Sequence, residues 1–370
     1  METKKYRFDE VTINFDKKRI PLSSAQREKR KGMFRYYGAQ GVIDHVDDYI
    51  FEGTYLLIAE DGENLKSKKQ NIAQVVDGQF WVNNHAHIVQ GNEQCDTRFL
   101  CYLINSMDLS GYITGSAQPK LSQANLNAVT LSLPTLAEQK RIVEYLYMLD
   151  QKIDVNRQIN DNLQQQAMAL YAEMFLNSSD NNVTSGTLSD IAAITMGQSP
   201  SGSSYNEDGV GEVFYQGRAE FGFRFPKRRL FTTEPKRMAE TGDVLLSVRA
   251  PVGDLNVAYE RCCIGRGLGA IHSKTGHSSF VLYTMFALRS QLDVFNGEGT
   301  VFGSINRDAL NAIPIDIPPV TEIDQFEAVA HPIDELIRAN YEENCRLEAI
   351  RDSLLPKLMS GEIDVSAVNL

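Results

Sequence analysis

Hydrophobic positions recur with a heptad period in two long stretches of the chain. Their spacing alternates between four and three residues, which places one side chain per turn along a single seam of an α-helix. We therefore predict two long helices, the first of which, residues 137–175, would measure about 58 Å. Pro332 and Pro356 should kink or shorten the second helix. The seam residues are Ile142, Leu146, Leu149, Ile153, Asn156, Asn160 and Leu163 in the first stretch, and Ile333, Ile337, Asn340, Asn344 and Leu347 in the second.

Two asparagines interrupt each apolar seam. Two such seams in one chain can bury each other, and polar seam positions suit a contact whose register and orientation must be fixed. An alternative is that each seam packs only on the globular part beside it.

The stretches that precede the helices have a different pattern. Short apolar or alternating runs, such as residues 53–59, 80–83 and 243–248, are separated by Gly, Asn, Asp and Ser clusters, which predicts strands and turns. Short helices are predicted at residues 97–105 and 279–292. We therefore expect two α+β domains with many loops, and a polar linker at residues 177–186.

The chain carries an internal repeat at an offset of 184 residues. LPTLAE at Leu133 aligns with IPPVTE at Ile317, and the match continues with Asp150 over Asp334. Further upstream the offset drifts, as where FDEV at Phe8 aligns with LSDI at Leu188. The repeat predicts two copies of one unit. The predicted segments are a globular domain at 1–132, a helical segment at 133–180, a second globular domain at 181–316 and a second helical segment at 317–370.

The charge is distributed unevenly between these segments. The chain has 370 residues and a net charge of −11. Residues 1–132 have 16 basic and 16 acidic residues and 181–316 have 13 and 14, whereas the helical segments have 4 and 7, and 4 and 11. The acidic helices should therefore face protein partners or solvent. Basic clusters at residues 17–19, 27–31, 66–69 and 224–229 have aromatic neighbours and could contact nucleic acid, or they could be solvated loops.

Composition favours a cytoplasmic protein. The N-terminus is not followed by an apolar stretch, and apolar runs elsewhere are short, so neither a signal peptide nor a membrane span is expected. The five cysteines are an odd number without CxxC spacing, which indicates reduced thiols.

The sequence contains no recognisable catalytic motif. The glycines between Cys263 and Ala270 lack the G-x-G-x-x-G spacing of a dinucleotide turn, and no P-loop or G-x-S-x-G elbow is present. His85 and His87 would share one face of a strand near Cys95, but further ligands at convincing spacing are missing, so a structural pair is the preferred interpretation. We therefore expect no catalytic residues and no metal site in this chain.

Several of these motifs together resemble the specificity subunits of type I restriction–modification enzymes. They are LPTLAEQKRIV at Leu133, LDQKI at Leu149, the weaker IPPVTE at Ile317 and LLPKLMSGEI at Leu354. The strings GQSP at Gly197, YQG at Tyr215, SVRAPVGD at Ser247 and GRGLGA at Gly265 resemble one class of that family's target-recognition domains. One departure is that the second copy has Asp324-Gln-Phe where the first has Lys140-Arg-Ile, so the two partner-binding surfaces need not be equivalent.

The resemblance implies an α+β protein in which two pseudo-repeated α/β target-recognition domains are separated by two long antiparallel coiled-coil helices. Each domain would read one half of a bipartite, asymmetric site in double-stranded DNA, and the helices would set the spacer and dock two modification subunits. The subunit itself would be non-catalytic. S-adenosylmethionine for adenine methylation, and ATP and Mg²⁺ for translocation and cleavage, would belong to partner modification and restriction subunits. A coiled-coil scaffold without sequence-specific DNA binding is the alternative.

Candidate base-reading residues are those with donor or bidentate side chains in loops of both copies. Arg249 and Arg266 could equally be internal ion-pair partners. The candidates are Arg19, Arg27, Tyr37, Gln40, Asn84 and Lys120 in the first domain, and Gln198, Ser199, Tyr205, Gln216, Arg218, Arg249 and Arg266 in the second.

Overall fold

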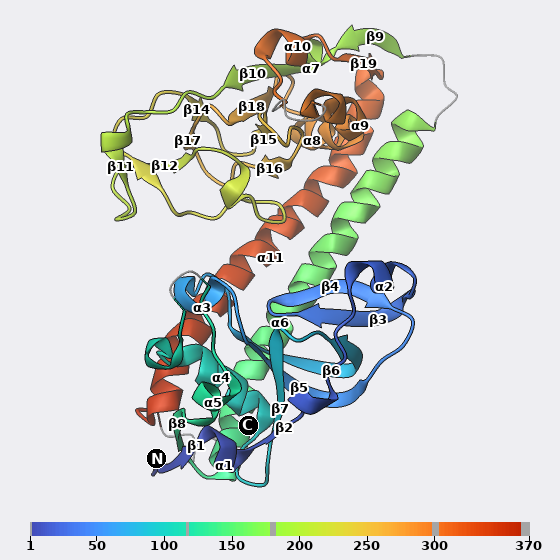
Figure 1. Ribbon diagram of the computed structural model, residues 1–370. Helices are drawn as coiled ribbons and strands as arrows, with labels where there is room; N and C mark the ends of the chain where they lie inside the picture. The colour runs from blue at the N-terminus through green and yellow to red at the C-terminus, as the bar shows by residue number, and fades with distance from the viewer. Residues whose placement is uncertain (1, 116–117, 178–182, 298–302, 364–370) are drawn as a thin grey trace. The chain divides into compact units, whose positions relative to one another are not determined.

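The computed structural model describes residues 2–115, 118–177, 183–297 and 303–363. The chain divides into two compact units, residues 1–154 with 344–370 and residues 155–343. Each unit contains one globular domain and part of both long helices, α6 (Leu136–Tyr171) and α11 (Val320–Ser360), shown in green and red-orange in Figure 1.

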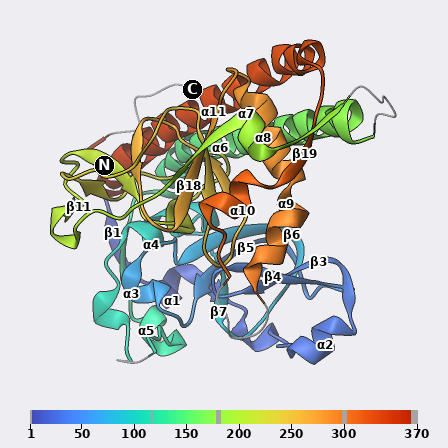
Figure 2. The same cartoon turned by 90° about the horizontal axis from the view of Figure 1, so that it is seen from above.

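The domain of the first unit is built on a six-stranded sheet with the order β2-β7-β5-β6-β3-β4. Its strands are antiparallel except that β3 and β6 are parallel. The central strands β5 and β6 carry apolar runs, and helix α4 packs against them (Figure 2). The elements are β1 (Lys4–Arg7), α1 (Phe8–Val11), β2 (Thr12–Asn14), α2 (Ser24–Glu28), β3 (Lys31–Gly38), β4 (Gly41–Val46), β5 (Phe51–Ala59), α3 (Asn64–Ser67), β6 (Ala73–Val82), β7 (Ala86–Gly91), α4 (Thr97–Ser106), α5 (Gln123–Asn127) and β8 (Thr130–Leu133).

The domain of the second unit has two main sheets, with the orders β10-β18-β15-β16 and β11-β13-β12-β17-β14. Helix α8 packs against β18. The elements are β9 (Thr184–Thr187), α7 (Leu188–Ile191), β10 (Ala192–Met196), β11 (Tyr205–Asn206), β12 (Glu212–Tyr215), β13 (Phe231–Thr232), β14 (Met238–Ala239), β15 (Val244–Ser247), β16 (Leu255–Val257), β17 (Cys262–Ile264), β18 (Leu268–Ser273), α8 (Ser278–Ala287), α9 (Arg289–Asp293), α10 (Arg307–Asn311) and β19 (Pro314–Ile317).

The repeat inferred from sequence is present in the strand topology. In the first unit β2, β7 and β5 are neighbours in that order, and β10, β18 and β15 have the same order in the second. Each unit also has a two-stranded antiparallel sheet, β1 with β8 and β9 with β19, which joins the start of its domain to the strand before its long helix. The sheets and helices confirm the predicted α+β class. The helix predicted at 97–105 is α4, whereas the one predicted at 279–292 is divided into α8 and α9.

The predicted seams pair the two long helices within each unit. In the first unit Asn344 Nδ2 donates to the carbonyl of Ile153 (3.4 Å), and in the second Asn160 Nδ2 donates to the carbonyl of Ile337 (3.2 Å). Residue numbers fall on one helix as they rise on the other, so the helices are antiparallel. None of the predicted seam residues is exposed.

The seam ends pack on the domains as well. Ile142 and Leu146 lie in the core of the first unit together with Leu358 of α11, and Ala167 lies in the core of the second unit with Phe326. The seams therefore pair with each other at their middle and pack on the domains at their ends, so the alternative that each seam packs only on its own domain is wrong.

The expectation that prolines shorten the second helix is wrong. Helix α11 runs without interruption through Pro332 and Pro356, both of which are exposed. A proline removes one backbone hydrogen bond, but the buried Ala330 and Ile337 hold the helix on its inner side.

The first helix ends close to its predicted limit, with a π-helical turn at Ala172–Leu176. The predicted linker at 177–186 lies partly outside the described residues, and its end, from Thr184, forms strand β9. The four predicted segment boundaries stay predictions. Among the described residues, no helix is both long and apolar enough to cross a membrane.

Candidate nucleic-acid interface

Five of the candidate residues in the second domain converge at one place. Backbone hydrogen bonds join the chain there: Gln198 N donates to the carbonyl of Ile264 (3.0 Å), and Gly267 N to that of Gln216 (3.2 Å). Val248 N donates to the carbonyl of Gly267 (3.0 Å), which brings the segment containing Arg249 to the same place. We call this set, Gln198, Ser199, Gln216, Arg249 and Arg266, the glycine-loop cluster.

Glycines allow these segments to approach closely. A Cβ atom at Gly197 would overlap the carbonyl of Gly265, and one at Gly267 would lie 2.7 Å from the carbonyl of Gln216. Both neighbours are backbone atoms that cannot give way, so any larger residue would separate the segments. These glycines, which lack the spacing of a dinucleotide turn, bring several strand ends together.

The side chains of the glycine-loop cluster are available to a ligand. Gln198, Gln216, Arg249 and Arg266 are exposed, and Ser199 Oγ accepts a hydrogen bond from Arg266 N (3.3 Å). Within the described residues neither guanidinium takes part in an ion pair. The interpretation of Arg249 and Arg266 as internal ion-pair partners is therefore not supported, and two amides and two guanidiniums, the groups that read adenine and guanine edges, lie together.

The other two candidates of the second domain are committed to internal contacts. Arg218 pairs with Asp254, whose second oxygen accepts from Arg289 (2.9 Å). The Tyr205 ring packs on Phe214 with centroids 4.9 Å apart, and its hydroxyl donates to the carbonyl of Pro200 (3.1 Å). Their DNA contacts stay predictions, but each would have to exchange an existing partner.

In the first domain the carboxylate of Glu60 binds two of the candidate residues, Arg19 and Lys120. Arg19 donates to it at 2.9 Å and Lys120 lies 3.2 Å from it. Arg19 also donates to the carbonyl of Ala86 (2.9 Å) and more weakly to that of Asn84 (3.4 Å). Burial alone raises the pKa of Glu60, but the hydrogen bond from Arg19 and the nearby positive charges outweigh it, so the pKa is lowered. The group is therefore ionised and holds Arg19 in place.

The exposed candidates of the first domain lie in turns at the same end of the sheet. Gln40 is in the β3–β4 turn, close to Gly62, and Asn84 is in the β6–β7 turn. With Lys120 they form an exposed polar group around Glu60 whose charges are largely compensated, in contrast to the glycine-loop cluster.

Two candidates of the first domain lie elsewhere. Tyr37 is only 4% exposed on β3 and packs edge-on against Phe80, so the expectation that it lies in a loop and reads bases is wrong. The end of β3 is buried, and Tyr37 packs in a core cluster with Phe51 and Phe80. Arg27 pairs with Asp44 (2.9 Å) and lies over the ring of Tyr36, so a DNA contact by it stays a prediction.

The basic cluster at 224–229 is not a free positive patch. Arg224 is 4% exposed and pairs with Asp334 of α11 (2.5 Å), and therefore cannot contact DNA phosphates. Arg228 pairs with Glu260 and Arg229 with Glu220. Sequence did not reveal these partners because they lie far away along the chain or on other elements.

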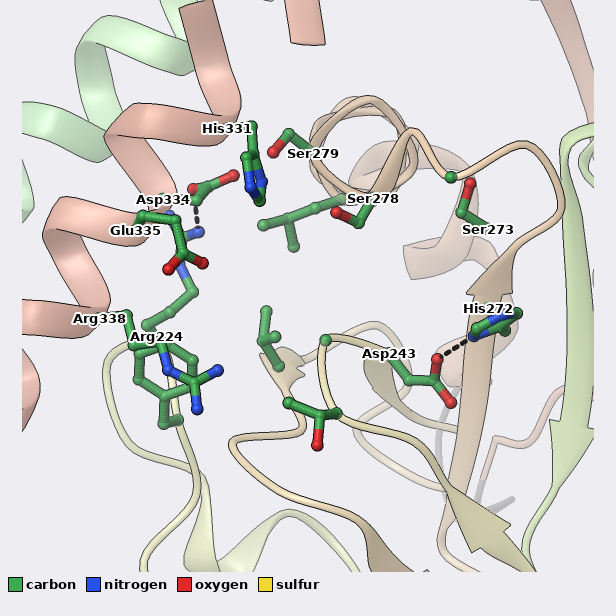
Figure 3. Close-up of a pocket in the computed structure, with 16 residues that line it drawn as sticks. Arg224, Asp243, His272, Ser273, Ser278, Ser279, His331, Asp334, Glu335 and Arg338 are labelled. Atoms are coloured by element: carbon green, nitrogen blue, oxygen red, sulfur yellow. Dashed lines mark hydrogen bonds and ion pairs between the residues drawn. The ribbon is translucent and has the colours of Figure 1, made fainter. Parts of the chain in front are cut away.

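A cavity of about 330 Å³ adjoins the Arg224–Asp334 pair. Figure 3 shows Asp334 and Glu335 of α11 on one side and Asp243 with His272 on the other. His272 Nδ1 lies 2.6 Å from Asp243 Oδ1. Groups of both charge signs line the cavity, so it lacks the uniformly basic character of a phosphate site.

The histidines considered as metal ligands have carboxylate partners. His87 is buried in β7, with Nδ1 2.6 Å from Asp16, whereas His85 lies in the turn before β7, 2.8 Å from Asp61. The expectation that both share one face of a strand is therefore wrong, because β7 begins at Ala86. In the described part of the chain, no group of three or more His, Cys, Asp or Glu side chains could hold a metal ion.

Comparison with known proteins identifies the family. The family model described as the type I restriction modification DNA specificity domain matches the chain twice, at residues 2–165 and 181–342. A relative from Methanocaldococcus jannaschii, provisionally named the specificity subunit of type I restriction enzyme MjaX, is 32% identical over 291 residues, or 72% of this chain and 68% of the relative. A second, similarly named protein, S.HindORF215P of Haemophilus influenzae, is 36% identical over 138 residues, which are 37% of this chain and 35% of that protein.

A solved structure shows the same fold. The S subunit of a type I restriction–modification system from M. genitalium matches 97% of this chain and 96% of its own length with a TM-score of 0.61, at 15% sequence identity. The alternative of a scaffold unrelated to DNA recognition is not favoured, because the family model covers both domains. The chain belongs to the family of type I restriction–modification DNA specificity subunits, in which two domains recognise the DNA target.

Proposed function

We propose that each domain reads one half of a bipartite, asymmetric site in double-stranded DNA. The observation that carries this proposal is the glycine-loop cluster, in which Gln198, Gln216, Arg249 and Arg266 present exposed donor groups at one edge of the second domain. Guanidinium and amide side chains make bidentate contacts to guanine and adenine in the major groove. In the first domain, the exposed residues Gln40, Asn84 and Lys120 would contact the bases of the other half-site, and Lys120 has a carboxylate partner.

The long helices serve as the spacer in this proposal. Helix α6 has 36 residues, about 54 Å at 1.5 Å per residue, which is an upper bound of about 16 base pairs at 3.4 Å each. The acidic character of both helical segments keeps them from binding phosphate without reading sequence. Their exposed faces are then free to dock two modification subunits.

Catalysis in this proposal belongs to the partners. Modification subunits would supply adenine methylation from S-adenosylmethionine, and restriction subunits would supply ATP- and Mg²⁺-dependent translocation and cleavage. This chain would contribute only the choice of DNA sequence, as a non-catalytic cytoplasmic subunit. Its membership in a family of specificity subunits supports this division of labour.

The test compares Arg249→Ala and Arg266→Ala with Arg261→Ala in the complete system. Arg261 is an exposed arginine of the same domain that pairs with Glu212 (2.8 Å) and Glu240 (3.4 Å), so it controls for loss of a surface charge. Mapping of methylated sites and salt-dependent duplex binding are the measurements. We expect each cluster variant to weaken binding and to relax one half-site, at about 1–3 kcal/mol per bidentate contact, while the control resembles wild type. Unchanged sites and unchanged affinity in both cluster variants would remove the cluster from the interface.

A further inference from the structure

The two units share an equivalent hydrogen bond between domain and long helix. In the first, Tyr102 of α4 donates to Asp150 of α6, with an oxygen–oxygen distance of 2.5 Å. In the second, Tyr283 of α8 donates to Asp334 of α11 at 2.9 Å. Each tyrosine is the sixth residue of its helix, and the aspartates are the pair aligned by the 184-residue repeat. The two copies have thus kept the same contact while their reading loops differ.

An arginine also binds each aspartate, but from a different direction. In the first unit it is Arg351 of α11, 2.9 Å from Asp150, and in the second it is Arg224 of the domain itself, 2.5 Å from Asp334. Arg224 also reaches Gln164 of α6 (3.1 Å), so it links the second domain to both helices. Each carboxylate therefore accepts from an arginine as well as from the tyrosine hydroxyl, and hydrogen bonds between charged groups are shorter and stronger than neutral ones.

The tyrosines are suited to act as fixed donors. Tyr283 is 1% exposed and Tyr102 is partly buried. Burial, followed by the hydrogen bond to Asp150, raises the pKa of Tyr102, and burial likewise raises the pKa of Tyr283. Both hydroxyls therefore keep their protons at neutral pH, and a hydrogen bond between two sheltered, oriented groups defines an angle as well as a distance.

The helices that carry the tyrosines connect the long helices to the sheets. Helix α4 packs on β5 and β6, and α8 packs on β18, the strand that leads out of the glycine-loop cluster. A second polar contact ties each of them down. Glu327 of α11 accepts from the backbone of Ser279 (3.1 Å) and Phe280 (2.9 Å) at the start of α8. Gln139 of α6 accepts from Asp96 N (2.9 Å) at the start of α4.

We propose that the Tyr102–Asp150 and Tyr283–Asp334 hydrogen bonds are positioning contacts that set the angle of each recognition domain on its long helix, and through it the number of base pairs tolerated between the two half-sites. The inference rests on the proposed function, because it concerns the spacing between the half-sites that the domains read. The tyrosines act through their domains and touch no DNA.

The experiment replaces each hydroxyl alone, in Tyr102→Phe, Tyr283→Phe and the double variant, within the complete system with its modification subunits. Methylated sites are mapped, and the complex is then titrated with duplexes whose spacer has the wild-type length or is one base pair shorter or longer. We expect unchanged half-site sequences, near-normal affinity for the wild-type duplex, and a preference for the correct spacer that falls about fivefold per variant, as loss of one ordinary hydrogen bond implies.

Tyr145→Phe is the matched control. Tyr145 is a partly buried residue of α6 whose hydroxyl has no hydrogen-bond partner in the described part of the chain, so its removal changes the same atom on a long helix without breaking a contact. It should keep the wild-type spacer preference. If the two positioning variants also keep it, the inference is wrong. If the wild-type complex itself methylates no bipartite site, the proposed function fails instead, and the two failures are distinguishable.

Discussion

Asn340 Nδ2 of α11 donates a hydrogen bond to Asn160 Oδ1 of α6 at 2.8 Å, inside the helical seam. Asn160 in turn donates to the carbonyl of Ile337, and Asn156 Nδ2 donates to Glu343 (2.7 Å). A polar pair of this kind can be satisfied in only one register of the two helices, whereas leucines can pack in several. The asparagines therefore define how the helices align.

Replacing both asparagines of this pair by leucine should make the protein more stable to unfolding and less specific for the spacer length. In Asn160→Leu/Asn340→Leu we expect a higher unfolding temperature, because the apolar seam becomes continuous, together with a broader range of accepted spacer lengths. Calorimetry and mapping of methylated sites measure the two effects. A variant that is both less stable and unchanged in its spacer would contradict this account of the seam.

A test of the hypothesis that the helices set the spacer requires insertions in both helices. An insertion near residues 156–163 alone would shift the asparagines of α6 past their partners on α11. We expect one heptad added after Asn160 and one before Asn340 to preserve the pairing and lengthen the recognised spacer by about three base pairs, since seven residues add about 10.5 Å. The one-sided insertion is the control and should reduce activity. If the methylated sites keep the wild-type spacer length after the paired insertion, the hypothesis is wrong.

The Arg224–Asp334 pair should matter greatly for stability. Asp334→Asn removes the charge that compensates a buried guanidinium, and breaking a buried pair in this way costs about 3–5 kcal/mol. Asp324→Asn, the same substitution at a 60%-exposed carboxylate of the same helix that pairs with His277, should cost less than about 1 kcal/mol. Denaturant unfolding of both variants provides the comparison, and equal losses would show that burial of the pair is unimportant.

The pH dependence of the first unit should reflect the buried His87–Asp16 pair. Burial favours neutral His87, but the hydrogen bond to Asp16 outweighs it and raises the pKa of His87. Burial raises and the hydrogen bond from His87 lowers the pKa of Asp16, with a net lowering. Because the pKa of His87 is raised, its contribution to folding stability is fully present below about pH 6.5 and is lost as the pH rises through the folded-state pKa. Because the pKa of Asp16 is lowered, its contribution is present above about pH 4 and is lost as the pH falls through the folded-state pKa.

The wild type should therefore exceed His87→Gln in stability most strongly between about pH 4 and 6.5, and the difference should shrink toward pH 9. Trp81, the single tryptophan of the chain, is 3% exposed in the first domain, so its fluorescence follows unfolding of this unit. His45→Gln, at an exposed position of β4, is the control. A difference that grew with pH would have the wrong sign for this mechanism.

The cysteines should differ sharply in reactivity. Burial raises the pKa of Cys95 and Cys262 to about 12, whereas Cys345 is exposed on α11. We expect a thiol reagent to modify Cys345 in the native protein and the other thiols only after denaturation, because the thiolate is the reactive form. Mass spectrometry of the labelled peptides measures this, and rapid native labelling of Cys262 would contradict the structure.

Much of the architecture could be predicted from local pattern. The heptad spacing identified both helices, and none of the seam positions that it predicted is exposed, while the repeat identified Asp150 and Asp334 as equivalent. Such patterns are legible because a helix repeats every 3.6 residues, so the positions that face a partner follow from spacing alone. The sequence also indicated the donor side chains of the glycine-loop cluster, because Gln198, Gln216, Arg249 and Arg266 lie within the strings GQSP, YQG, SVRAPVGD and GRGLGA.

Tertiary structure decided which charged side chains are available. The local sequence around Arg224, Arg249 and Arg266 does not show which of them is exposed. Arg224 is buried against Asp334, 110 residues away, whereas the other two are exposed. Tyr37 and Tyr283 likewise became core and positioning residues through partners on other elements. The sequence by itself determined periodicity, duplication and the separation of charge. Which side chain meets which carboxylate depends on contacts between distant segments, and these form only when the sheets and helices pack together.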